Sequence, residues 1–207
     1  MKFRNFWSTR RREVSSWTEG AANHPFPVYP PPKPGKVWNI VLFLLTLATT
    51  ILAGALQEGV NPLKSPEEIY KGIPFSFALM CILLAHELGH YLMAKKHGMN
   101  VTLPYFIPAP SFIGTFGAFI KMRSPAKDRR MLLDIGAAGP LVGVMVSIPF
   151  LILGLRLSQV KLIDGQAGTA LGDSLLLFLI SRLVIGPMPT GYDIVIHPVG
   201  FAGWIGL

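Results

Sequence analysis

The segment HELGH, residues 86–90, places two imidazoles and a carboxylate within five residues. On a helix, side chains four residues apart lie on one face about one turn apart, so the ring nitrogens of His86 and His90 can meet one metal ion. Glu87 is offset around the helix, where its carboxylate can reach a water molecule that the metal activates. The spacing predicts a zinc centre in which Glu87 takes a proton from the attacking water and returns it to a leaving amine.

A structural role is the alternative for these residues, because buried histidines and glutamates can also pair with one another. The motif, however, lies inside the apolar run IPFSFALMCILLAHELGHYLMA, which is long enough to cross a bilayer. Each ionisable group near the middle of a span costs on the order of 2.5 to 3.5 kcal/mol on insertion scales. Three such groups within five residues therefore favour a functional metal site.

Composition indicates which elements position the motif. Of the 207 residues, 51% are hydrophobic and 14% are charged, unlike an average soluble domain. We expect an all-α polytopic membrane protein with four to five transmembrane helices. The expected spans are Val37 to about Leu56, about Pro74 to Ala94, Met131 to about Leu155, and about Leu171 to Ile185, with HPVGFAGWIGL opening a fifth. Residues 37–207 are thus expected to form a transmembrane core that is truncated at its C-terminus.

Residues 1–36 are basic and then proline-rich, which is typical of a cytosolic tail ending in an extended linker. Seven of the 19 Lys and Arg residues lie before Trp38, and seven more lie between Lys95 and Arg130. Basic blocks also occur in nucleic-acid-binding proteins, but no recognition motif accompanies these, so no nucleic-acid partner is expected. The single cysteine, Cys81, excludes an internal disulfide.

The two basic blocks also predict the topology, because Lys and Arg concentrate on the cytosolic side of membrane spans. This rule places the loops at 95–130 and 186–199 inside, and the loops at 57–73 and 156–170 outside. HELGH then lies toward the cytosolic end of the second span, with His86 roughly 13 Å from Lys95 along the axis. The site therefore requires a water-filled access cavity.

The loop at 100–122 is apolar, but its three prolines at 104, 108 and 110 exclude a continuous helix. Its aromatic and β-branched residues and glycines suit a hairpin that folds back beside the HELGH helix. The alternative is an interfacial loop anchored by Tyr105 and Phe106. The sequence leaves both interpretations open.

Other residues give weaker signals. Asp134 lies one turn inside the third span and either approaches the metal or faces the basic loop. Gly136, Gly139 and Gly143 have spacings that allow close helix packing, and Pro140 is expected to bend their helix. His197, a lone histidine before a proline, is expected to be a loop residue.

The chain resembles a known family in three consecutive features: HELGH in a hydrophobic span, a proline-rich loop ending in GTFGAFIKMRSP, and then LLDIGAAGPLVG. Together they are similar to the site-2 protease family of intramembrane zinc metalloproteases, in its branch without a PDZ domain. The resemblance covers about Ile73 to the C-terminus. It implies zinc as cofactor, His86 and His90 as zinc ligands, and Glu87 as general base.

The same resemblance implies the reaction and the partners. The implied activity is hydrolysis of a peptide bond in or near a transmembrane segment of a membrane-anchored protein within the lipid bilayer. It also implies strands near 101–121, where an unwound substrate helix pairs edge to edge. An integral, multi-pass location is expected, in a bacterial or archaeal plasma membrane rather than a plastid because the N-terminal tail is short.

The third zinc ligand departs from the family pattern, in which it is an aspartate of an LDG motif in a later span. No LDG occurs here, and the IDG at 163–165 comes too early and on the predicted outer side. Catalytic zinc normally takes three protein ligands plus water. We therefore expect the third ligand downstream of Leu207, with Asp134 as an internal alternative.

Two non-proteolytic functions compete with this interpretation. One is a catalytically inactive homologue or fragment that binds client transmembrane helices without cleaving them. The other is a metal transporter, which would need ionisable residues distributed over several spans. In this chain they cluster in one span.

Overall fold

The computed structural model describes residues 36–123, 128–162, 174–187 and 191–207. The chain divides into two units, Met1–Gly35 and Lys36–Leu207, and the described residues all belong to the second. The predicted cytosolic tail at 1–36 therefore lies, apart from Lys36, outside the described residues.

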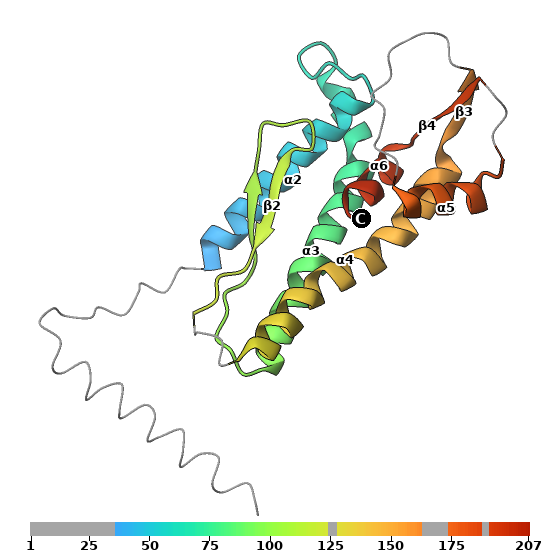
Figure 1. Ribbon diagram of the computed structural model, residues 1–207. Coiled ribbons are helices and arrows are strands. Elements are labelled where there is room, and N and C mark those ends of the chain that lie inside the picture. The colour runs from blue at the N-terminus through green and yellow to red at the C-terminus, as the bar shows by residue number, and fades with distance from the viewer. Residues whose placement is uncertain (1–35, 124–127, 163–173, 188–190) are drawn as a thin grey trace, which may run out of the picture. The chain divides into compact units, whose positions relative to one another are not determined.

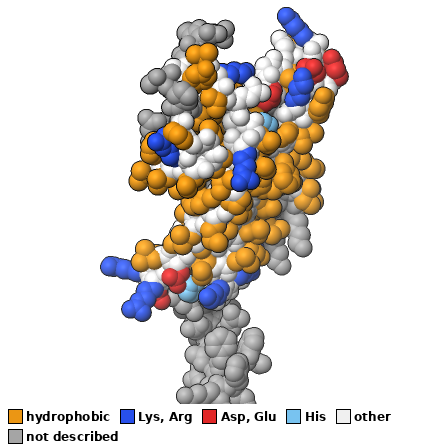
Figure 2. All heavy atoms as spheres, turned by 90° about the vertical axis from the view of Figure 1, so that its right-hand side faces the viewer, with side chains coloured by type: hydrophobic (Ala, Val, Ile, Leu, Met, Phe, Trp, Pro, Cys, Tyr) orange, Lys and Arg blue, Asp and Glu red, His pale blue; other side chains and the backbone are white. Residues whose placement is uncertain are grey.

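Three long apolar helices form the framework: α2 (Lys36–Gln57), α3 (Ile73–Lys96) and α4 (Arg129–Leu157). Each is long and apolar enough to cross a membrane, α3 together with the short helix η1 (Pro66–Gly72) that precedes it. They correspond to the first three predicted spans and run side by side (Figure 1). Figure 2 shows a band of hydrophobic side chains between basic side chains at the two ends of one face. This pattern is typical of a chain placed across a bilayer.

Small and polar residues hold α2 against α3 and against η1, whose last residue is Gly72. The buried hydroxyls of Thr50 and Ser76 lie 2.7 Å apart, and hydroxyl pairs of this kind join helices in an apolar environment. A Cβ atom on Gly54 would lie 2.7 Å from the Gly72 carbonyl oxygen. The two backbones can therefore approach closely only because both positions are glycine.

The loop after α3 forms an antiparallel hairpin of β1 (Tyr105–Pro108) and β2 (Thr115–Phe119). A hairpin is one of the two interpretations that the sequence left open for this loop. Gly114 at the turn has a φ of +83°, and a Cβ atom there would lie 2.5 Å from the Thr49 carbonyl oxygen of α2. The hairpin packs mainly on α2, with β2 also contacting α3, so one strand lies next to the helix that carries HELGH.

The region after α4 differs from the prediction. Within the described residues the expected fourth span is α5 (Leu175–Val184), whose ten residues are about half the length that crosses a bilayer. β3 (Gln159–Leu162) also pairs with β4 (Tyr192–Val195). Two segments that were predicted on opposite sides of the membrane are thus hydrogen-bonded neighbours, and that part of the predicted topology is wrong. The count of four to five spans is not confirmed.

The C-terminal helix α6 (Pro198–Ile205) packs antiparallel against α4. Gly200 lies against Gly154, Gly203 against Leu151, and Gly206 against Ser147. Because these contacts run backward along α4 as α6 advances, α6 starts near the C-terminal end of α4 and returns alongside it (Figure 1). The predicted fifth span therefore begins at the end of α4 that was expected to lie outside.

The glycine at the α4–α6 contact provides a stability test. A Cβ atom on Gly154 would collide with the backbone of Gly200, so Gly154→Ala should destabilise the fold by about 1–3 kcal/mol, the usual cost of overpacking. Gly136→Ala in the same helix is the matched control, because a Cβ atom there meets open space and alanine favours a helix by about 1 kcal/mol. Denaturant titration in detergent micelles measures both, and equal midpoints would contradict the predicted contact.

Candidate metal centre

The candidate site lies where α3 and α4 approach most closely. A Cβ atom on Gly89 would lie 2.6 Å from the carbonyl oxygen of Ala138, so the two helix backbones nearly touch. One position further along each helix, Gly139 lies directly against the His90 ring, with no room for a Cβ atom. One turn away, a Cβ atom on Gly143 would lie 3.0 Å from His86 Nδ1. The two glycines therefore provide the space that the two imidazoles occupy.

The two imidazoles face one another on α3. Their Nε2 atoms lie 3.1 Å apart, and the ring planes are inclined by 70°. His90 Nδ1 lies 2.7 Å from the Ile135 carbonyl oxygen of α4. Because a carbonyl oxygen only accepts hydrogen bonds, Nδ1 carries the hydrogen and donates it. Nε2 of neutral His90 then carries a lone pair, and it accepts a hydrogen bond from His86 Nε2. A neutral imidazole nitrogen of this kind is also the atom through which histidine binds a metal.

Glu87 lies between the two histidines in sequence and is only 6% exposed. Among the described residues, no group forms a hydrogen bond or an ion pair with its carboxylate. No buried side-chain oxygen of the described residues lacks a hydrogen-bond partner, so the Glu87 carboxylate oxygens are not themselves fully enclosed, although the residue as a whole is buried. Glu87 directly follows His86 in α3, and its role as general base stays a prediction.

The histidine pair fits two coordination positions of zinc. Two nitrogen atoms that each bind one zinc ion at about 2.0–2.1 Å in a tetrahedral site lie about 3.3 Å apart. The observed separation of 3.1 Å is close to this value. The carbonyl bond to His90 Nδ1 is also the second contact that orients metal-binding histidines in proteins.

A third ligand is not found among the described residues, which contain no group of three His, Cys, Asp or Glu side chains that could hold a metal. Asp134 accepts a bond from His97 Nε2 at 2.9 Å, and its side chain is 53% exposed. Of the two positions predicted for Asp134, the structure supports the contact with the loop that follows α3. Asp134, which the sequence suggested as an internal third zinc ligand, is thus paired with His97.

The other candidate residues lie elsewhere. His197 lies in the loop before α6, as predicted, and it is the N-cap of that helix, where its Nδ1 accepts from the Val199 amide at 3.3 Å. The IDG at 163–165 lies outside the described residues. Of the three glycines, Gly139 and Gly143 pack closely, but against histidine rings, while Gly136 faces open space.

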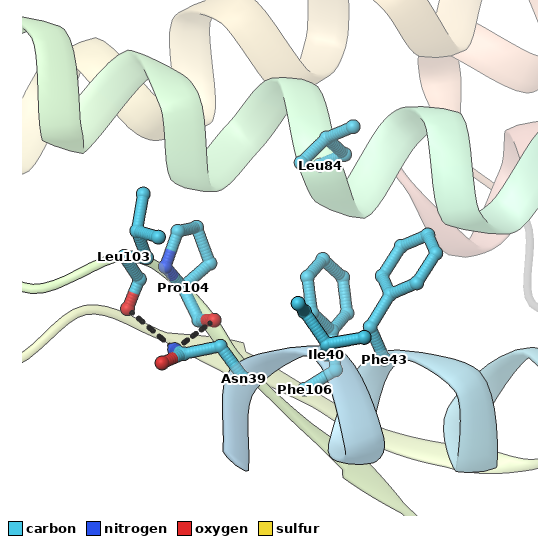
Figure 3. A pocket seen from close by; sticks show the side chains of 7 residues that line it. All are labelled: Asn39, Ile40, Phe43, Leu84, Leu103, Pro104 and Phe106. Carbon is cyan, nitrogen blue, oxygen red and sulfur yellow. Dashed lines mark hydrogen bonds between the residues drawn. The ribbon is translucent and has the colours of Figure 1, made fainter. Parts of the chain in front are cut away.

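A cavity of about 280 Å³ lies between α2, α3 and the segment leading into β1. Figure 3 shows the Asn39 side chain at its edge, donating to the carbonyl oxygens of Leu103 at 3.2 Å and Pro104 at 2.8 Å. No titratable or nucleophilic side chain lines it; its residues are Asn39, Ile40, Phe43, Leu84, Leu103, Pro104 and Phe106. This cavity therefore does not contain the chemistry of the site.

Sequence reasoning missed the two glycine contacts and the Ile135 carbonyl. One signal could have suggested the glycines: Gly139 and Gly143 have the same four-residue spacing as His86 and His90. When two helices pack antiparallel, a pair of glycines on one helix and a pair of histidines on the other, both spaced by four residues, can make both contacts at once. The contact of the Ile135 carbonyl with His90 has no sequence signal, because every residue carries a backbone carbonyl group.

Residues 74–206 match the model of peptidase family M50, and the chain belongs to this family, the site-2 protease family. The resemblance predicted from HELGH and its flanking segments is thus confirmed at the level of the family.

Plant relatives show the same similarity. The chain is 32% identical over 208 residues to "Probable zinc metalloprotease EGY1, chloroplastic" of Arabidopsis thaliana, covering 85% of this chain and 37% of that protein. It is 30% identical over 176 residues to "Probable zinc metalloprotease EGY2, chloroplastic" of the same plant, covering 84% of this chain and 31% of the relative. The chain thus spans about a third of the length of these curated relatives. No solved structure matches it.

The contact between Gly139 and His90 predicts a spectroscopic change. Gly139→Ala should displace the imidazole and break its bond to the Ile135 carbonyl, since no space exists for the methyl group. Nitrogen NMR of ¹⁵N-histidine-labelled protein in micelles, with His90→Gln for assignment, should show His90 protonated at Nδ1 in the wild type. In Gly139→Ala, His90 should no longer be confined to the Nδ1-protonated tautomer. In Gly136→Ala, it should remain in that tautomer. A mixed tautomer in the wild type would contradict the geometry.

Proposed function

We propose that this chain carries the zinc-binding helix of an intramembrane metalloprotease that hydrolyses a peptide bond in or near a transmembrane segment of a membrane-anchored protein. The convergence of the His86 and His90 Nε2 atoms at 3.1 Å beside buried Glu87 carries this proposal. Membership of family M50 supports it. His86 and His90 would hold the zinc ion, and Glu87 would act as general base.

When bound, zinc supplies Lewis acidity that activates water and polarises the substrate carbonyl. Glu87 accepts the proton of the attacking water as the water oxygen bonds to the carbonyl carbon. Glu87 then donates this proton to the amide nitrogen as the carbon–nitrogen bond breaks, so a carboxylic acid and an amine leave. The Ile135 carbonyl holds the His90 tautomer throughout, because its bond is to Nδ1 and not to the reacting face.

A catalytic zinc ion normally takes three protein ligands, and His86 and His90 supply two. Asp134 is paired with His97, so we do not propose it for the third position. The proposal concerns the two positions that this chain contributes.

Substrate presentation follows from the hairpin. β2 pairs with β1 along one edge, and within the described residues its other edge has no strand partner. An extended peptide can add to such an edge through main-chain hydrogen bonds. An intact substrate helix keeps its carbonyls hydrogen-bonded, so a substrate would have to unwind beside β2 before Glu87 and the metal could act on it.

A multi-pass location in a bilayer is supported by the three apolar helices. The bacterial or archaeal plasma membrane predicted from the short tail stays a prediction, and the plant relatives are named as chloroplastic. The proposed partners are the lipid bilayer and a membrane-embedded protein substrate.

Binding of client transmembrane helices without cleavage is the second candidate function. The observation that favours it is the lack of a third ligand group among the described residues. It retains the hairpin edge as the binding surface but assigns no chemistry to Glu87.

Cleavage with a matched carboxylate control separates the two functions. The full-length protein, reconstituted in liposomes with zinc and a mixture of single-span peptides, should release fragments detected by mass spectrometry. Glu87→Gln should lower the rate by about 10²–10⁴-fold, the usual contribution of acid–base catalysis, with zinc content unchanged. Glu68→Gln should be neutral, because Glu68 is half-exposed and pairs with Lys71 in η1. Equal rates in both variants would exclude Glu87 as the base, and binding without cleavage would favour the second function.

A further inference from the structure

A second cavity, of about 270 Å³, lies between α3, the hairpin and α6. Its lining includes Leu79 and Leu83 of α3, Ile113 and Thr115 at the hairpin turn, Gly117 of β2, and Ile205 of α6. We call it the turn cavity. It shares no lining residue with the cavity of Figure 3.

The turn cavity opens on the same face of α3 as the two histidines. Leu79, Leu83, His86 and His90 follow one another at intervals of four, three and four residues, the spacing of a single helical stripe. Leu83 precedes His86 by three residues, or about 4.5 Å along the helix axis. A peptide lying along this stripe would therefore contact the cavity and the metal centre within about one to two residues of each other.

The cavity also borders the free edge of β2. Three consecutive residues, Thr115, Phe116 and Gly117, line it, although consecutive side chains on a strand point to opposite faces. Residues from both faces can line one cavity only along the strand edge. No residue of β1 contributes, so this is the edge that β1 leaves unpaired.

The lining offers no free polar side chain. The Thr115 hydroxyl donates to the Ile107 carbonyl at 2.8 Å and accepts from the Gly117 amide at 3.0 Å, so its hydrogen-bonding capacity is used within the hairpin. All the other lining side chains are apolar or, at Gly117, absent. The volume is also below the roughly 300–1,000 Å³ typical of sites for whole small molecules. Size and polarity together suit one apolar side chain.

We propose that the turn cavity is a subsite that receives a single apolar side chain of the substrate, next to the peptide bond that is cleaved. This inference rests on the proposed function for its placement beside a scissile bond. Leu83 separates the cavity from the histidines along α3 and is the specificity-determining residue. A strand added at β2 would hold every second side chain on the cavity side, which fixes which residue enters.

Photo-crosslinking tests the subsite without requiring cleavage. A single-span peptide carrying one diazirine leucine, moved stepwise along the chain, is bound to the full-length Glu87→Gln protein in liposomes, and the linked residues are mapped by mass spectrometry. We expect links to Leu79, Leu83 or Ile205 from one position or from alternate positions. Leu83→Trp should reduce them at least tenfold by filling the cavity. Leu84→Trp is the matched control, because the neighbouring Leu84 lines the other cavity, and it should leave the links intact.

Cleavage preference gives the second measurement. Leu83→Ala should favour larger aromatic residues beside the cleaved bond at least tenfold, whereas Leu84→Ala should leave the preference unchanged. Links elsewhere on the protein, or links that Leu83→Trp does not reduce, would overturn the subsite. So would cleavage with an unaltered residue preference in Leu83→Ala. Links in the turn cavity without cleavage by the wild type would instead overturn the proposed hydrolysis and retain the cavity as a side-chain binding site.

Discussion

The close approach of α3 and α4 at Gly89 and Gly139 is the constraint on which the site depends. At this point the helix backbones nearly touch. Gly89 of α3 lies against the Ala138 carbonyl of α4, and Gly139 of α4 lies against the His90 ring of α3. This proximity brings the Ile135 carbonyl within 2.7 Å of His90 Nδ1 and so determines which ring nitrogen carries the hydrogen and which faces His86. In an apolar environment, where helices gain little from hydrophobic burial, such close contacts are a main source of association. The packing that holds the helices together thus also orients the imidazoles.

The other elements complete the environment of this contact. The hairpin lies over α2 and approaches α3 through β2, while α6 packs against both α3 and α4. Between them they leave an apolar cavity one turn from His86 and an unpaired strand edge. A substrate that enters as a helix in the membrane would exchange its internal hydrogen bonds for bonds to this edge, which removes the cost of exposing its backbone to lipid. In the proposed function, the non-helical hairpin is therefore the place where a helical substrate would unwind.

Much of this arrangement could be predicted from the sequence because it depends on local patterns. The first three apolar runs are long enough to define α2, α3 and α4, and the four-residue spacing places His86 and His90 on one face. The prolines at 104, 108 and 110 excluded a helix, which left a hairpin as one of two possibilities. Each of these inferences uses residues close together in the chain.

The errors arise where the outcome depends on contacts between distant segments. The run LLLFLISRLV is apolar enough to suggest a span, but the pairing of Gln159–Leu162 with Tyr192–Val195 returns the chain to the same end of α4. Likewise, the contacts of Gly139, Gly143 and the Ile135 carbonyl with the histidines depend on the register of α4 against α3, which no local pattern reveals. Asp134 could be assigned only once its contact with His97 was known.

Zinc titration of the purified protein tests the central claim most directly, with the wild type compared with His86→Ala, His90→Ala and His97→Ala. We predict one zinc ion per wild-type chain and a loss of affinity of more than about tenfold in the first two variants, because even residues that merely orient a ligand contribute that much. His97→Ala should bind as the wild type does, since His97 contacts Asp134 and not the imidazole pair. Equal affinity in all four proteins, or no zinc in the wild type, would contradict the account.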